Sequence, residues 1–88
     1  MIRFENMRFC LTGTFMFGRR RDCEAAIAAK GGEAGPLRRD TNYLVIGEYA
    51  TDAWIHSTYG RKIEKAVEMR ANNLPIAIVS EAHWRQYL

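Results

Sequence analysis

The sequence predicts a small α/β domain with a four-stranded parallel sheet flanked by three helices. Short apolar runs that end at glycine or begin at proline are typical of buried strands, and longer stretches between them carry apolar residues at helical spacing. Strands separated by helices pair in parallel through right-handed crossovers. With 88 residues the chain has room for one domain. We expect its core to run from about residue 7 to residue 88.

The first part of the chain predicts a strand, a helix and a weaker strand. The apolar run from Met7 that ends at Thr12-Gly13 is short and predicts a buried strand. From about Arg20, one helical face carries apolar residues: Cys23, Ala26 and Ile27. Gly31-Gly32 ends this helix, because glycine accepts the left-handed conformation of a C-terminal cap. A second strand is expected over Glu33–Leu37, although Gly35 and Pro36 weaken its pattern.

The middle of the chain contains the clearest strand, Tyr43–Ile46, which is closed by Gly47. The polar segment 38–42 before it predicts a turn. Residues 48–58 after it predict a loop, with one helical turn around Trp54.

The last part of the chain predicts a helix, a strand and a short helix. The helix is expected over 60–72, with a common apolar face made of Ile63, Ala66, Val67 and Ala71. Pro75 opens the last strand, Ile76–Val79. Ser80 is a good N-cap for a final helix, whose Trp84 we expect in the core.

Composition indicates an ordinary globular domain that is mildly basic. Hydrophobic residues make up 48% and charged residues 26%, which argues against disorder or a coiled coil. Thirteen basic and 10 acidic residues give a net charge of +3, and the pI near 9.1 permits nucleic-acid binding. Cys10 and Cys23 lie in apolar patterns without metal-ligand spacing, so we expect buried thiols in a reducing compartment. Since no apolar run approaches the about 18 residues that span a bilayer, a cytoplasmic protein is expected.

Catalytic patterns are absent from the sequence. Asp22 and Glu24 lie two residues apart and therefore on different faces of their helix. His56 and His83 are isolated from other metal-ligating residues, and neither a phosphate loop nor a dinucleotide-binding glycine motif occurs. We therefore expect a binding module rather than an enzyme, with no metal and no cofactor.

An ordered set of short motifs between Phe9 and Leu88 resembles a BRCT domain, especially those of NAD-dependent DNA ligases and of the large subunit of replication factor C. The motifs are Leu11–Phe15, Gly31-Gly32, Thr41–Gly47, Arg61–Ala66, Ile78–Glu81 and Trp84. The segment Met69–Leu74 is a few residues longer than is usual in the family, which lengthens one loop. The resemblance implies the same four-stranded fold and a non-catalytic module of DNA replication and repair.

The resemblance also implies a phosphate-binding site made of Thr12, Gly13, Arg21 and Lys62. Thr12 ends the first strand at its carboxyl end, where α/β sheets bind ligands. Arg21 and Lys62 lie near the starts of two helices, which we expect side by side, and helix starts favour anions. Arg20 is the alternative arginine, because the preceding loop, Phe15–Gly18, is one residue longer than in the BRCT domains that the sequence resembles. The other interpretation is that no phosphate binds here. Thr12 is then only a cap, and the two cations are solvated residues at the starts of their helices.

Further arginines are candidates for contacts with neighbouring DNA phosphates: Arg19, Arg20, Arg38, Arg39 and Arg61. We expect the ligand to be DNA with a 5′-phosphorylated end or nick, in a bacterial nucleoid or a nucleus. The alternatives are a phosphopeptide bound in the same site, or a protein-interaction or dimerisation module whose site is vestigial. The loop Phe15–Phe17 is either an exposed partner surface or a cover for the end of the sheet.

Overall fold

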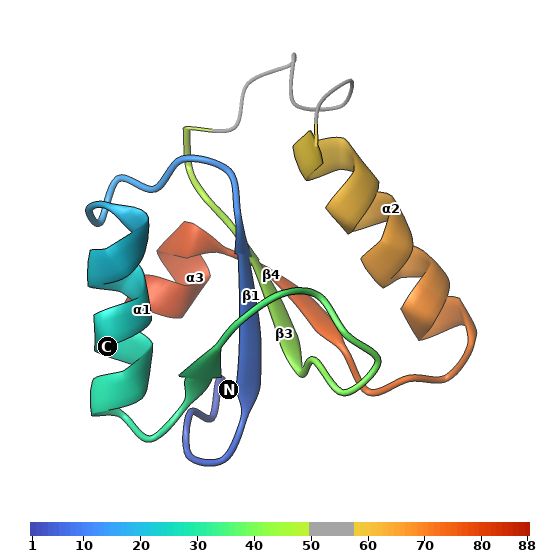
Figure 1. The fold of residues 1–88 in the computed structure, drawn as a ribbon, viewed down its shortest axis with the longest axis horizontal. Helices are drawn as coiled ribbons and strands as arrows, with labels where there is room; N and C mark the ends of the chain where they lie inside the picture. The colour runs from blue at the N-terminus through green and yellow to red at the C-terminus, as the bar shows by residue number, and fades with distance from the viewer. Residues whose placement is uncertain (50–57) are drawn as a thin grey trace.

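The computed structural model describes residues 1–49 and 58–88 (Figure 1). Its elements are β1 (Arg8–Thr12), α1 (Arg20–Ala29), β2 (Glu33–Ala34), β3 (Tyr43–Ile46), α2 (Thr58–Ala71), β4 (Ala77–Ser80) and α3 (Glu81–Arg85). The strands of this part of the chain form one parallel sheet in the order β2-β1-β3-β4. The predicted fold class and order of elements are confirmed. The helical turn expected around Trp54 lies outside the described residues.

Element boundaries differ from the predicted ones by small amounts, and the differences have local causes. β2 has two residues instead of five, because after Gly35 donates its N–H to Phe9 the chain turns away at Pro36. β4 begins one residue later than expected and ends at Ser80. The Ser80 hydroxyl accepts the N–H of His83 at 3.1 Å, which confirms Ser80 as the N-cap of α3.

Helices cover both faces of the sheet, with α1 and α3 on one face and α2 on the other (Figure 1). The expectation that the second helix lies beside the first is therefore wrong. A right-handed crossover from β1 to β2 steps along the sheet in one direction, and one from β3 to β4 steps in the opposite direction. Crossovers of one hand that step in opposite directions must place their helices on opposite faces.

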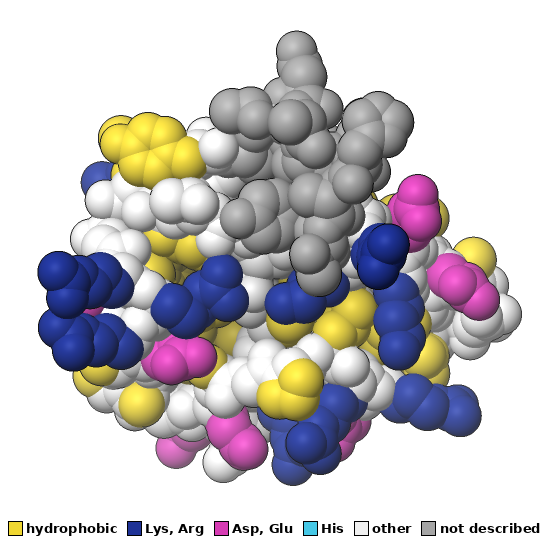
Figure 2. All heavy atoms as spheres, turned by 45° about the horizontal axis from the view of Figure 1, so that its top comes forward, with side chains coloured by type: hydrophobic (Ala, Val, Ile, Leu, Met, Phe, Trp, Pro, Cys, Tyr) yellow, Lys and Arg dark blue, Asp and Glu magenta, His cyan; other side chains and the backbone are white. Residues whose placement is uncertain are grey.

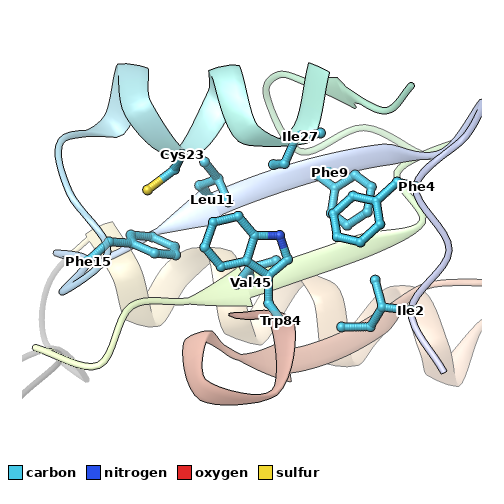
Figure 3. Packing of buried hydrophobic residues seen from close by; sticks show 9 residues of the cluster. All are labelled: Ile2, Phe4, Phe9, Leu11, Phe15, Cys23, Ile27, Val45 and Trp84. Carbon is cyan, nitrogen blue, oxygen red and sulfur yellow. The ribbon is translucent and has the colours of Figure 1, made fainter. Parts of the chain in front are cut away.

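The larger core cluster lies between the sheet and the helices α1 and α3 (Figure 3). Its buried residues are Ile2, Phe4, Phe9, Leu11, Phe15, Cys23, Ile27, Val45 and Trp84. Trp84 lies in the middle of this cluster and is completely buried, as predicted. The rings of Phe4 and Phe9 stack with centroids 5.1 Å apart, and Phe9 stacks on Tyr43 at 4.8 Å. The packed unit thus begins at Ile2 rather than at residue 7.

The end of α1 shows why its two glycines are needed. Gly31 has a φ of +85°, and its N–H donates to Ala28 while that of Gly32 donates to Ile27, both at 3.0 Å. This pair of bonds is the Schellman motif. A Cβ on Gly32 would lie 2.8 Å from the Ile27 side chain, so close packing requires glycine there as well. The predicted helix stop is confirmed.

The second core cluster joins α2 to the opposite face of the sheet and corrects the predicted helix face. Ala66 and Met69 are buried and Ile63 is half-buried, whereas Val67 is 54% exposed and Ala71 is exposed. Ile63 and Ala66 therefore lie on the predicted face, but Met69 takes the place of Val67 and Ala71. The buried stripe follows positions three residues apart, whereas Val67 and Ala71 follow Ile63 at spacings of four. Both spacings fit a helix of 3.6 residues per turn, so the pattern alone favours neither.

Both cysteines are buried and unpaired, as the sequence predicted. Burial raises the pKa of each thiol, because the thiolate would lose its hydration in the core. Among the described residues, no helix is long and apolar enough to cross a membrane.

Two neighbouring substitutions on α2 test the corrected helix face. Ala66→Asp is expected to lower the free energy of unfolding by about 3–5 kcal/mol, because it places an unpaired carboxylate against the sheet. Val67→Asp is expected to change it by less than about 0.5 kcal/mol, since valine and aspartate have similar helix propensity and the site is exposed. Urea denaturation followed by circular dichroism measures both. The reverse ranking of the two variants would refute this placement of α2.

Candidate functional site

The carboxyl ends of β1 and β3 form the point at which the direction of the sheet connections reverses. These strands are neighbours, with Thr12 paired to Ile46, but the chain leaves β1 toward β2 and leaves β3 toward β4. Ligands of open α/β sheets bind in the crevice that such a divergence creates. Thr12 and Gly13, two residues of the predicted phosphate site, lie at this point.

Two glycines let the exits of β1 and β3 approach one another. Gly13 has a φ of +87°, and a Cβ there would lie 3.4 Å from the Gly47 nitrogen. A Cβ on Gly47 would collide with the carbonyl oxygen of Thr14. The two turns therefore pack backbone against backbone. Glycine is favoured at residue 13 by its positive φ and required at residue 47 by the lack of space for a Cβ.

Thr12 is 1% exposed, and its hydroxyl makes no hydrogen bond within residues 1–49 and 58–88. Since side chains alternate along a strand, Thr12 lies on the same face of the sheet as Cys10, the face that α2 covers. A buried hydroxyl without a partner costs free energy and is uncommon in folded proteins. Among the described residues, the Trp84 Nε1 is likewise buried without a partner, but it lies in the core cluster between the sheet and the helices α1 and α3, whereas the Thr12 hydroxyl lies at the end of β1.

Backbone groups at the end of β1 point alternately toward β3 and away from it. The N–H of Gly47 donates to the Thr12 oxygen at 2.8 Å, so Thr12 faces β3. Leu11 and Gly13 then face the side of β2, which is too short to reach them. The N–H of Gly13 makes no backbone hydrogen bond in the part of the chain that the structure describes.

Arg20 occupies the place that a longer β2 would fill. Its Nη1 donates to the Leu11 oxygen at 3.0 Å and its Nη2 to the Gly13 oxygen at 2.9 Å. The guanidinium also lies 5.8 Å from the centroid of the Phe15 ring. These contacts hold a positive charge at the end of β1 while using two of the five N–H donors of an arginine.

Lys62 lies on the side of α2 that faces the sheet, one turn before Ala66, and is half-buried. Burial raises the pKa of Cys10, and the positive charges of Lys62 and Arg20 offset part of that increase. Both cations are therefore within electrostatic reach of Cys10, two residues before Thr12 on the same face of β1. The orientation of α2 about its own axis, which leaves Val67 exposed, also turns Lys62 toward this site.

Arg21, the arginine preferred from the sequence, is exposed and makes no side-chain hydrogen bond among the described residues. The start of α1 is already occupied by a carboxylate, since Asp22 Oδ2 accepts the Arg19 N–H at 3.0 Å. The structure thus places Thr12, Gly13, Lys62 and the alternative arginine, Arg20, at one end of the sheet. Arg21 lies outside this group.

The arginines expected to contact DNA phosphates are exposed but separated. Arg19 precedes α1, Arg61 lies on α2, and Arg38 and Arg39 lie in the loop between β2 and β3. A hollow of about 140 Å³ opens near that loop, between residues that include Arg8, Arg38 and Thr41. It lies beside the start of β1, away from Thr12, and its Arg8 is paired with Asp40 at 2.8 Å.

A buried glutamate, which the sequence did not reveal, fixes the loops around the site. Glu81 is completely buried at the start of α3. Its Oε1 accepts the N–H groups of Met16 and Glu48, each at 2.9 Å, and its Oε2 accepts that of Phe17 at 2.6 Å. The one available signal was an acidic residue directly after an N-cap, which many exposed helix starts share.

The side chains of the loop Phe15–Phe17 are divided between the core and the surface. Phe15 is buried and meets Trp84 edge-on at 5.8 Å between centroids, so it covers the end of the sheet. Met16 and Phe17 are 51% and 41% exposed, although Phe17 also meets the Trp84 ring at 5.4 Å.

Figure 2 shows the molecule with the carboxyl end of the sheet turned forward. Lys and Arg side chains are spread across this face from the α1 side to the α2 side, with fewer Asp and Glu among them. Exposed hydrophobic side chains gather at its upper left. Within residues 1–49 and 58–88, no group of three or more His, Cys, Asp or Glu residues is placed to hold a metal ion.

Comparison with known proteins adds no assignment to this geometry: no protein-family model matches the chain, and no curated protein is significantly similar to it.

Substitutions of Glu81 test its control of the site loops. Glu81→Gln is expected to lower the free energy of unfolding by about 1.5–3 kcal/mol, because an amide group replaces one charged acceptor. Glu81→Ala removes the acceptor of three buried N–H groups and is expected to cost more. Urea denaturation measures the stability, and amide NMR shifts of Met16, Phe17 and Glu48 report the loops. Glu24→Gln, on the exposed surface of α1, is the control and is expected to have little effect on the stability. An effect of Glu81→Gln as small as that of the control would contradict the role assigned to Glu81.

Proposed function

We propose that this domain is a non-catalytic module that binds duplex DNA at a 5′-phosphorylated end or nick. The phosphate is held at the carboxyl ends of β1 and β3 by Thr12, Gly13, Arg20 and Lys62. The observation that carries the proposal is the buried Thr12 hydroxyl, which has no partner among the described residues and lies at the divergence point of the sheet. A bound phosphate oxygen supplies the acceptor that this hydroxyl lacks.

The chemistry of the four groups favours a phosphate over other small ligands. A hydroxyl, a backbone N–H, a guanidinium and an ammonium all donate hydrogen bonds, and two of them carry positive charge. A terminal phosphate carries nearly two negative charges near pH 7 and offers three strong acceptor oxygens. A set of four donors, two of them positively charged, matches that ligand.

The wider charge distribution favours DNA over a phosphopeptide. Exposed arginines lie on α2, before and within α1, and in the loop between β2 and β3: Arg19, Arg21, Arg38, Arg39 and Arg61. A phosphopeptide carries one phosphate, whereas a duplex presents a phosphate at short intervals along each strand. The resemblance of the sequence motifs to BRCT domains of DNA replication and repair supports the same choice. A phosphopeptide ligand is an outcome that the following measurements detect.

Single substitutions separate the phosphate contact from general DNA binding. Lys62→Ala is expected to weaken binding of a 5′-phosphorylated duplex by about 1.5–3 kcal/mol and to leave its unphosphorylated twin nearly unaffected, because the lost contact exists only with the phosphate. Thr12→Val is expected to act more mildly on binding while leaving the stability unchanged or higher, since valine removes an unpartnered hydroxyl. Fluorescence anisotropy and urea denaturation measure the two quantities.

The two neighbouring arginines provide an internal control. Arg20→Lys keeps a charge but loses the fork that bridges Leu11 and Gly13, so the preference for the phosphorylated duplex is expected to fall. Arg21→Lys is expected to leave the preference intact. The opposite result would assign the site to Arg21. If the wild-type protein showed no preference for the 5′-phosphate, the proposed function would be refuted. Tighter binding of a phosphopeptide than of the phosphorylated duplex would also refute it.

Salt dependence tests the arginines outside the site. If several of them neutralise backbone phosphates, log K falls with log salt at a slope of about −0.9 per phosphate contact. Arg38→Ala combined with Arg39→Ala is expected to lower the affinity and flatten the slope, without changing the preference for the phosphorylated end. Affinity that hardly changes between 50 and 200 mM salt would argue against the duplex as ligand.

A further inference from the structure

Three large apolar side chains are exposed around the exits of β1 and β3: Met16, Phe17 and Tyr49, the last 57% exposed. We refer to them as the apolar cluster. Single exposed hydrophobic residues are ordinary, but a group of them on neighbouring loops marks a contact surface.

Hydrogen bonds bring the two loops of the apolar cluster together. Oε1 of Glu81 accepts the N–H groups of both Met16 and Glu48, so these backbones lie on either side of one oxygen atom. The N–H of Tyr49 donates to the Thr14 oxygen at 3.1 Å. The loops are therefore fixed before any ligand arrives, and a fixed apolar surface loses little conformational entropy on binding.

The apolar cluster adjoins the proposed phosphate site. Met16 follows Gly13 by three residues, which span at most about 10 Å. Tyr49 follows Gly47, whose backbone packs against Gly13. A single nucleotide can therefore occupy both the phosphate site and the cluster, because only one sugar separates its base from its 5′-phosphate.

We propose that the apolar cluster receives the exposed face of the terminal base pair of the DNA, while Thr12, Gly13, Arg20 and Lys62 hold the 5′-phosphate of the same nucleotide. This inference rests on the proposed function and deepens it. A base pair is flat and apolar on its exposed face, which suits the rings of Phe17 and Tyr49 and the flexible thioether of Met16. At a duplex end this face lacks a stacking neighbour.

Charge around the cluster favours nucleic acid over an apolar protein partner. The loop that carries Met16 and Phe17 leads directly into three consecutive arginines, Arg19–Arg21. Figure 2 shows Lys and Arg side chains spread across this end of the molecule. Stacking on aromatic side chains tolerates every base, so the module would recognise the end of a duplex rather than its sequence.

The test compares two 5′-phosphorylated duplexes that differ only in the terminal nucleotide, which is intact in one and abasic in the other. Wild-type protein is expected to bind the intact end roughly tenfold more tightly or better, the scale of stacking one base on an aromatic surface. In the double variant Met16→Ser, Tyr49→Ser this ratio is expected to approach one. Both side chains are exposed, so the variant is expected to fold, and circular dichroism checks it. Replacing the terminal base by 2-aminopurine gives a second readout, because stacking quenches its fluorescence.

The preference for the 5′-phosphate separates this inference from the proposed function. The double variant is expected to keep it, since its phosphate site is intact. Val67→Ser, which replaces an exposed apolar residue on α2, is the matched control and is expected to change neither ratio. A wild-type protein that prefers the phosphate but binds intact and abasic ends equally would overturn this inference alone. Loss of the phosphate preference in wild-type protein would overturn both. A dimer in sedimentation that the double variant dissociates would assign the cluster to a second copy of the chain and overturn the base-stacking proposal.

Discussion

The carboxylate of Glu81 is the interaction on which this end of the domain depends. Loops that leave a parallel sheet carry backbone N–H groups that the strands no longer pair, and burying such groups costs about 1–3 kcal/mol each. Glu81 accepts three of them, from segments 33 to 65 residues away in the sequence. Its own burial is tolerable because the charge is surrounded by donors. One side chain therefore fixes the start of α3, the loop after β1 and the exit of β3 against Trp84, and these are the segments that surround Thr12 and Gly13.

Local patterns in the sequence were sufficient for the fold class and for most elements. The apolar run Tyr43–Ile46, the glycine pair at residues 31 and 32 and the cap at Ser80 each depend on a few neighbouring residues. The face of α2 was only partly predicted. Ile63 and Ala66 pack against the sheet as expected, but Val67 and Ala71 do not. Met69 lies on the buried stripe instead, because contact with the sheet, which no local pattern contains, selects residues three apart. Whether α1 and α2 cover the same face of the sheet or opposite faces depends on the order of the strands, which no local sequence pattern reveals. Glu81 was missed for the same reason, since its partners are distant in sequence.

The residues of the candidate site were likewise predictable from the sequence only in part. Thr12 and Gly13 were predictable, because a strand that ends at threonine and glycine places them at the carboxyl edge of a parallel sheet. The choice between Arg20 and Arg21 was not, since adjacent positions on a helix point about 100° apart and the start of α1 was uncertain by a residue. The Leu11 and Gly13 carbonyls decide it physically: β2 is too short to pair with them, and only Arg20 reaches both. Whether these residues bind a phosphate stays a prediction.

The shortness of β2 and the arrangement of donors are linked. A longer β2 would pair the end of β1 through its own N–H and carbonyl groups and leave nothing for a ligand. In its place Arg20 satisfies only the carbonyls, because a guanidinium has donors and no acceptor. The backbone N–H of Gly13 is thus left beside a positive charge, and the Thr12 hydroxyl lies next to it on the face that carries Lys62. A sheet edge completed by an arginine, rather than by a strand, therefore presents donors and positive charge together, which is the chemistry that the proposed phosphate site requires.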